Sequence, residues 1–169
     1  MTHVLWQRLD LIARNVSPFA FTVLLLVVGL VPWRLPYLPP IGISLVLVSV
    51  YYWAIHRPGA LPAPAIFIVG LLADLLSGGF LGVNVLVLLV VYAGTVALRR
   101  WLVGAAFAIV WWSFAIVSSL ALVLTWAITW FLVGAAADFA PGVSGTLFGV
   151  AAYPLLATFF ARAQRTLLR

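Results

Sequence analysis

The sequence predicts an all-α fold: one polytopic transmembrane helical bundle of about six spans, forming a single membrane domain over residues 1–169. Of these residues 66% are hydrophobic and only 7% are charged, whereas a soluble domain is roughly half apolar and a quarter charged. The hydrophobic residues fall into runs near the length of about 20 residues that a spanning helix needs. Little length remains for loops, and we expect no separate soluble domain.

The expected helices follow one another with short connections. Residues 3–16 predict an interfacial amphipathic helix, because Leu5 and Leu9 share a helical face from which the charged residues are absent. Ser17 and Pro18 then provide a helix start, a capping hydroxyl followed by proline. The expected spans are about 18–33, 41–55, 62–76, 83–98, 103–133 and 141–160, followed by a basic cytoplasmic tail at 161–169.

Aromatic residues and proline refine this picture. As one helix the stretch 103–133 would be about 45 Å long, more than a hydrocarbon core of about 30 Å. Trp111 and Trp130 lie near its two ends, which favours one tilted span over two short ones. The cluster 51–53 (Tyr-Tyr-Trp) is expected at the headgroup boundary, and Pro154 is expected to kink the last span.

Arginines are distributed unevenly between the predicted loops. If the N-terminus is inside, Arg34 is the only one of the nine arginines outside. Because arginine is enriched in cytoplasmic loops, this distribution predicts that both termini lie in the cytoplasm. The basic residues are spread between apolar runs rather than gathered in one patch, so we expect a lipid bilayer and no nucleic acid as partner. The inner arginines are Arg8, Arg14, Arg57, Arg99, Arg100, Arg162, Arg165 and Arg169.

Asp74 is the one ionisable residue well inside a predicted span. A carboxylate at the centre of a spanning helix costs about 2.5–3.5 kcal/mol on insertion scales, so it should face the bundle interior and find a partner. We favour a hydrogen bond to the following loop or to the next span, through Asn84 or Tyr92, and keep open a proton, ion or ligand site. Small residues on the same helical face would let a neighbouring helix approach: Gly70, Ser77 and Gly78.

Two more stripes of small or hydroxyl-bearing residues follow. In the last span, glycines at a close helical spacing indicate contact with another helix of this chain or of a partner: Gly142, Gly145 and Gly149. In the fifth span, hydroxyls on one face either bond within the bundle, the simpler interpretation, or line a cavity: Ser118, Thr125 and Thr129.

The inventory of reactive side chains predicts that the protein is not an enzyme. The sequence has no cysteine, lysine or glutamate, and its two histidines, His3 and His56, lie at predicted membrane boundaries. Neither a carboxylate pair for acid–base work nor a cluster of metal ligands can be assembled. We therefore expect no catalytic residue, no metal and no cofactor.

The glycine-rich connection between the third and fourth spans is the most informative stretch. Residues 73–84 read Ala-Asp-Leu-Leu-Ser-Gly-Gly-Phe-Leu-Gly-Val-Asn, and Tyr52-Trp53 and Arg57-Pro58 precede them. This pattern, with the length and the six-span layout, resembles the bacterial MreD family of rod shape-determining proteins. The family pattern carries over to five positions, without assigning them a chemical role, and Ser77 lies among them as a helix-packing candidate: Asp74, Gly78, Gly79, Gly82 and Asn84.

The resemblance implies a non-enzymatic scaffold subunit of the peptidoglycan elongation machinery that helps to regulate cell shape. Its direct partner would be the bitopic protein MreC. Through MreC it would join the actin-like MreB, the RodA glycosyltransferase and an elongation-specific penicillin-binding transpeptidase. The resemblance also implies a bundle similar to the substrate-binding subunits of energy-coupling-factor vitamin transporters.

Two other functions remain open at this point. The first is a substrate-binding membrane subunit of a vitamin-type uptake transporter, with a ligand enclosed in the bundle. The first helix of those subunits carries an Ala-x-x-x-Ala docking surface, and residues 17–33 lack that spacing, which argues against this function. The second is an ion or proton pathway around Asp74.

Overall fold

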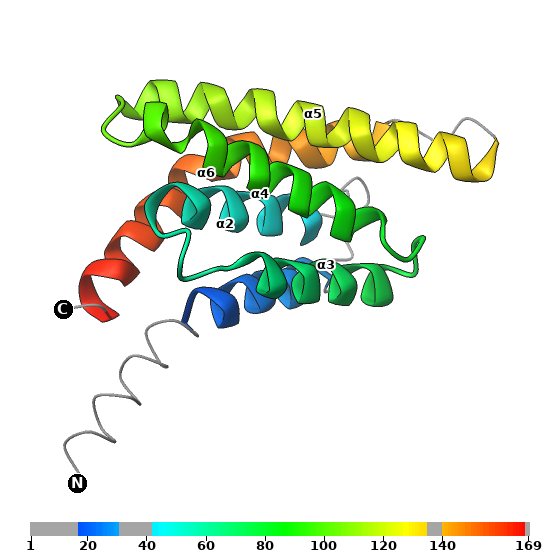
Figure 1. The fold of residues 1–169 in the computed structure, drawn as a ribbon, viewed down its shortest axis with the longest axis horizontal. Coiled ribbons are helices and arrows are strands. Elements are labelled where there is room, and N and C mark those ends of the chain that lie inside the picture. The colour runs from blue at the N-terminus through cyan, green and yellow to red at the C-terminus, as the bar shows by residue number, and fades with distance from the viewer. Residues whose placement is uncertain (1–16, 31–41, 135–139, 168–169) are drawn as a thin grey trace, which may run out of the picture.

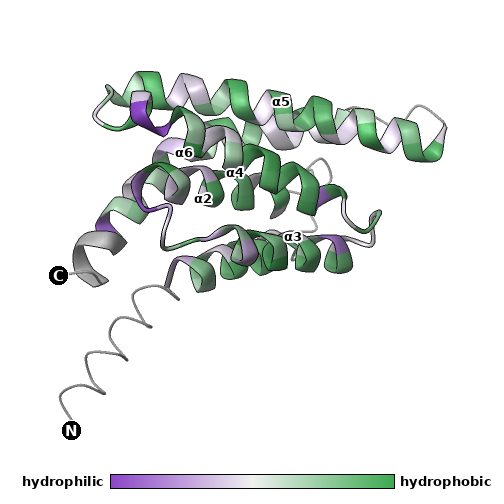
Figure 2. Cartoon of the chain, in the orientation of Figure 1, coloured by the Kyte–Doolittle hydropathy of each residue, from purple (hydrophilic) through white to green (hydrophobic). Residues whose placement is uncertain are grey.

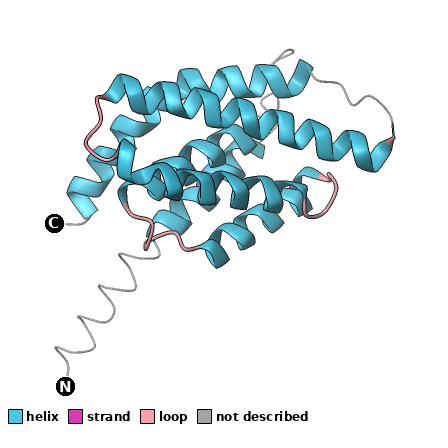
Figure 3. Ribbon diagram, turned by 45° about the horizontal axis from the view of Figure 1, so that its top comes forward, coloured by secondary structure: helices cyan, strands magenta, loops and turns pink. Residues whose placement is uncertain are grey.

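The computed structural model describes residues 17–30, 42–134 and 140–167. Within these ranges every regular element is a helix, as the sequence predicts (Figures 1 and 3). The predicted interfacial helix 3–16 lies outside the described residues, as do the end of the first predicted span and the loop that follows it. The helices are Ser17–Leu30, α2 (Gly42–His56), α3 (Ala63–Ser77), α4 (Val83–Leu102), α5 (Phe107–Val133) and α6 (Ala140–Leu167).

Helix ends depart from the expected ones between α4 and α5 and at the end of α6. The residues expected to open the long helix, from 103 onward, instead form a turn to Ala106. Gly104 has φ +86° there, a conformation that a helix cannot continue through. α4 therefore reaches Leu102, and α5 runs unbroken over 27 residues. α6 extends to Leu167, into the stretch expected to be the tail.

α2 lies at the centre of the bundle. Thirteen of its fifteen residues are buried, and α4, α5 and α6 all contact it. The aromatic cluster 51–53, expected at the headgroup boundary, does not face outward, because Trp53 is only 3% exposed and its neighbours are as deeply enclosed. Their rings pack against aromatic residues of α5 and α6 instead: Phe114, Tyr153 and Phe160.

Three of the described helices are long and apolar enough to cross a membrane: α4, α5 and the first 23 residues of α6 (Ala140–Arg162). Ser17–Leu30, α2 and α3 are apolar but shorter. With 15 residues α2 is about 22 Å long, less than a hydrocarbon core of about 30 Å. Because protein rather than lipid surrounds α2, its length need not match the bilayer. Apolar residues dominate the helices of the bundle (Figure 2).

Pro154 stands inside α6 and leaves a gap in its hydrogen-bond ladder. Proline has no N–H, so the Val150 carbonyl one turn earlier loses its intrahelical donor. The indole Nε1 of Trp111 on α5 donates to this carbonyl at 2.9 Å. In Figure 1, α6 turns away from the direction of its first half, in accord with the expected kink. The carbonyl that Pro154 leaves without an intrahelical donor is thus used in a hydrogen bond between α5 and α6.

Candidate functional site

The glycine-rich connection is a tight turn between α3 and α4, held by two glycines in the left-handed region. Gly78 ends α3 with φ +67°, and Gly82 precedes α4 with φ +97°. A side chain at either position would strain the backbone. Gly79, between them, does not have a positive φ, so its backbone conformation does not require glycine.

Asp74 clamps this turn from inside the bundle and is only 1% exposed. Its Oδ2 accepts the Gly82 backbone N–H at 2.8 Å. Its Oδ1 accepts the backbone N–H of Asn84 at 3.1 Å and the side-chain Nδ2–H at 2.8 Å. These donors lie at the N-terminus of α4, where the helix dipole favours a negative charge. Of the two partners named from the sequence, Asn84 bonds Asp74, whereas Tyr92 donates to the Pro58 carbonyl at 3.2 Å.

Gly70 lets α3 and α4 approach each other closely beside this clamp. A Cβ on Gly70 would lie 2.6 Å from the Val85 Cα, which is far inside van der Waals contact. Ser77, at the end of α3, places its hydroxyl 3.5 Å from the Asp74 carbonyl oxygen and is otherwise exposed. The small face predicted around Asp74 is therefore split between a helix contact at Gly70 and the turn itself.

The arrangement around Asp74 is suited to holding the turn. Both carboxylate oxygens accept hydrogen bonds from N–H groups. Among the described residues, no group of three histidine, cysteine, aspartate or glutamate side chains could hold a metal ion. A carboxylate engaged in this way ties α3 to the start of α4, much as a helix-capping side chain does.

The glycine stripe of α6 packs against other helices of the same chain. A Cβ on Gly142 would lie 2.4 Å from Cδ1 of Leu122 on α5. A Cβ on Gly149 would lie 3.2 Å from the Ser44 Cβ on α2, and Gly145 between them is buried. Glycine at these positions lets α6 lie close to both neighbours.

The hydroxyls of α5 bond within their own helix. Ser118 donates to the Ala115 carbonyl, Thr125 to that of Ala121, and Thr129 to that of Thr125. Ser118 and Thr125 also line a small cavity of about 140 Å³ between α2, α4, α5 and α6. A much larger open groove, of about 600 Å³, runs between α4 and α5 and is lined almost entirely by apolar and small residues.

Arg57 lies in the α2–α3 turn, and Arg99 and Arg100 lie in the last turn of α4. Figure 1 shows these segments at the end of the bundle opposite the α3–α4 turn that Asp74 holds. Arg99 lies near the end of α4, about 22 Å along the helix from Asn84. Its Nε donates at 2.7 Å to the Ile55 carbonyl in the last turn of α2. Arginine thereby satisfies a carbonyl that has no intrahelical partner and complements the negative end of the α2 dipole.

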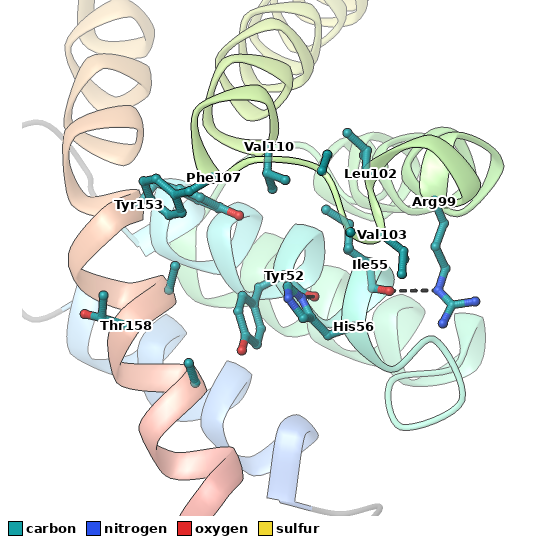
Figure 4. A pocket seen from close by; sticks show the side chains of 14 residues that line it. Tyr52, Ile55, His56, Arg99, Leu102, Val103, Phe107, Val110, Tyr153 and Thr158 are labelled. Carbon is teal, nitrogen blue, oxygen red and sulfur yellow. Dashed lines mark hydrogen bonds between the residues drawn. The ribbon is translucent and has the colours of Figure 1, made fainter.

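A pocket of about 410 Å³ opens beside Arg99 (Figure 4). Residues of α2, the α4–α5 turn, α5 and α6 form its walls, among them Tyr52, His56, Phe107 and Tyr153. Sequence reasoning missed this pocket, because it counted Arg99 only as a loop charge. The close approach of helix Ser17–Leu30 to the start of α2 was also not predicted. A Cβ on Gly42 would lie 3.2 Å from the Gly29 carbonyl carbon there.

Comparison with known families identifies the family of this chain. The family described as rod shape-determining protein MreD matches residues 10–161. The chain belongs to the MreD family. No curated protein and no solved structure matches the chain, so the expected likeness to energy-coupling-factor subunits stays a prediction.

Membership of the MreD family confirms the resemblance seen in the turn between α3 and α4. It makes this chain a membrane protein that determines rod shape. The helices long enough to cross a membrane agree with that location. The clamp of Asp74 and the left-handed glycines lie within the matched range, at the positions that carried the resemblance.

Proposed function

We propose that this MreD-family chain is a non-enzymatic scaffold subunit of the peptidoglycan elongation machinery and binds MreC directly. The family match over residues 10–161 carries the proposal. A second observation supports it: Asp74, Arg99 and Trp111 all direct polar groups into contacts between elements of the chain. Side chains used in this way stiffen a bundle, and a scaffold needs a stiff surface.

In the proposed arrangement all six described helices cross the plasma membrane, and both termini lie in the cytoplasm. The described arginines support this orientation, because they belong to segments at one end of the bundle (Figure 1): the α2–α3 turn with Arg57, the last turn of α4 with Arg99 and Arg100, and the second half of α6 with Arg162. The turn between α3 and α4 then faces the periplasm. Positive charge retained on the cytoplasmic side is the expected pattern.

MreC is the proposed direct partner, and MreB, RodA and an elongation penicillin-binding transpeptidase belong to the larger complex. Depleting the chain in a rod-shaped host should give round, widening cells, and MreC should co-purify with it in mild detergent. Unchanged cell width together with an absence of MreC from the purified complex would overturn the proposal.

The face that meets MreC can be mapped because the sequence contains no cysteine. Single substitutions Ile116→Cys and Leu120→Cys sample the α4–α5 groove, and Phe67→Cys and Leu75→Cys sample the exposed side of α3. All four native side chains are apolar and between 48% and 63% exposed, so the two sets are matched in chemistry and access. Crosslinks to MreC confined to one set would identify the contact face. Equal, weak crosslinking from both sets would contradict a specific interface.

A further inference from the structure

The pocket beside Arg99 has one cationic edge and an apolar interior (Figure 4). Tyr52 and His56 stack with ring centroids 4.2 Å apart and form part of the α2 wall. Phe107 and the fully buried Tyr153 face the cavity from α5 and α6. A ligand that fills this space has to be amphipathic: anionic at the arginine and apolar beyond it.

Arg99 has no carboxylate partner among the described residues. Asp74 is the only acidic residue described, and it lies at the other end of α4 with both oxygens engaged. Arg99 is fixed through its Nε by the Ile55 carbonyl. Its two terminal nitrogens remain to donate to an anion, and their position is set in advance.

The rim of the pocket is suited to contact with lipid. Val103 and Phe107 line it and are 55% and 52% exposed. A soluble anion would gain nothing from apolar walls and an apolar rim, whereas an acyl chain would bury surface against both. Basic pockets between transmembrane helices on the cytoplasmic side are known to hold the headgroups of anionic lipids.

We propose that this pocket binds one anionic phospholipid, with its phosphate on Arg99 and the start of an acyl chain against Phe107 and Tyr153. The lipid comes from the leaflet at the arginine-rich end, which is the inner leaflet in the proposed orientation. A lipid held there joins α2, the α4–α5 turn and α6, so it stabilises the bundle as well as binding to it.

The test is native mass spectrometry of the purified full-length chain, titrated with phosphatidylglycerol and with phosphatidylcholine of the same acyl chains. Phosphatidylglycerol should bind as a single retained lipid and more tightly than phosphatidylcholine. Arg99→Gln should weaken phosphatidylglycerol roughly fivefold or more, from the free energy of about 1 kcal/mol per basic residue at an anionic lipid surface. Arg100→Gln is the matched control, because it removes the same charge from an exposed neighbour that does not line the pocket.

A second variant keeps Arg99 and its bond to α2 intact. Ala161→Phe places a ring in the pocket from α6 and should displace the lipid, whereas Ala151→Phe adds the same ring on an exposed part of that helix. Loss of the retained lipid in Ala161→Phe but not in Ala151→Phe would support the site even if Arg99→Gln fails to fold.

Several results would overturn the proposal. Equal weakening by Arg99→Gln and Arg100→Gln would mean that lipid is attracted by diffuse surface charge. Retention of phosphatidylglycerol by Ala161→Phe would place the lipid elsewhere. Displacement of the lipid by inorganic phosphate alone would make the ligand a soluble anion. None of these results bears on MreC binding, so failure of the proposed lipid site would leave the proposed scaffold role unaffected.

Discussion

Asp74 illustrates how a single buried carboxylate is accommodated near the end of an apolar helix, since it lies in the last turn of α3 rather than at the centre of a span. A charge at the centre of a spanning helix would cost about 2.5–3.5 kcal/mol, and this position avoids part of that cost. Hydrogen bonds from Gly82 and Asn84, at the positive end of α4, offset the rest. The charge is therefore compensated within one turn of chain, and the same contacts fix the geometry of the turn.

Substitutions at Asp74 separate hydrogen bonding from charge. Asp74→Asn can still offer one oxygen to the two N–H groups of Asn84, so it should retain most of the folded protein. Asp74→Leu leaves the two buried donors of Asn84 unpaired, at about 1–3 kcal/mol for each group, and should lower the melting temperature and the amount in the membrane. Fluorescence-detected gel filtration after heating measures both. Equal loss in the two variants would indicate that the negative charge itself is required.

The sequence was informative about this site because buried charge is rare and its partners are local. Asp74 stood alone in an apolar run, and Asn84 was ten residues away across an obvious turn. Arg99 and Trp111 could not be assigned in the same way. Their acceptors, the carbonyls of Ile55 and Val150, lie 44 and 39 residues away, and backbone carbonyls carry no signal in a sequence.

At the scale of the helix, the central place of α2 decides how the others pack. From its length and hydropathy, α2 would be expected to be a short spanning helix in contact with lipid. Nearly all of its residues are instead buried against other helices of the chain. Hydropathy cannot distinguish lipid from protein surroundings, because both are apolar. That is why the number and order of helices could be predicted, while the burial of Tyr51 and Trp53 could not.

The contact between α3 and α4 depends on the missing side chain at Gly70. Gly70→Ala forces a Cβ to within 2.6 Å of the Val85 backbone, so the helices must separate. Such overpacking typically costs about 1–3 kcal/mol, and the melting temperature in detergent should fall. Gly94→Ala on α4 is the control, since no atom lies within 4 Å of its Cβ and alanine favours a helix. Equal effects of the two substitutions would argue against close packing at Gly70.

The bond from Trp111 to Val150 predicts a non-additive pair of substitutions. Trp111→Phe removes the donor and leaves a part-buried carbonyl unpaired in apolar surroundings, at a cost of about 1 kcal/mol. Pro154→Ala restores an N–H that can bond the same carbonyl within α6. Trp111→Phe should therefore cost less stability in the Pro154→Ala background, with a coupling of at least about 0.5 kcal/mol in a double-mutant cycle. Additive costs would mean that Trp111 acts only by filling space.

Across the whole molecule, polar groups divide by sign between the two ends. The clamped carboxylate of Asp74 lies beside the α3–α4 turn, and the described arginines lie in the α2–α3 turn, at the end of α4 and in the second half of α6, at the other end of the bundle (Figure 1). The proposed orientation in the membrane rests on this asymmetry, because arginine is retained on the cytoplasmic side. In that orientation the α2–α3 turn faces the cytoplasm and the α3–α4 turn faces the periplasm.

Two glycines allow that orientation to be tested with little disturbance of the fold. Gly59 in the α2–α3 turn has open space around its Cβ position, and Gly79 in the α3–α4 turn would make only one ordinary contact at 3.6 Å. A membrane-impermeant maleimide should label the Gly79→Cys chain in intact spheroplasts and the Gly59→Cys chain only after permeabilisation. Labelling of both chains after permeabilisation is the control for reactivity. The reverse pattern would invert the bundle and move the proposed lipid site to the outer leaflet, because Arg99 and Gly59 lie at the same end.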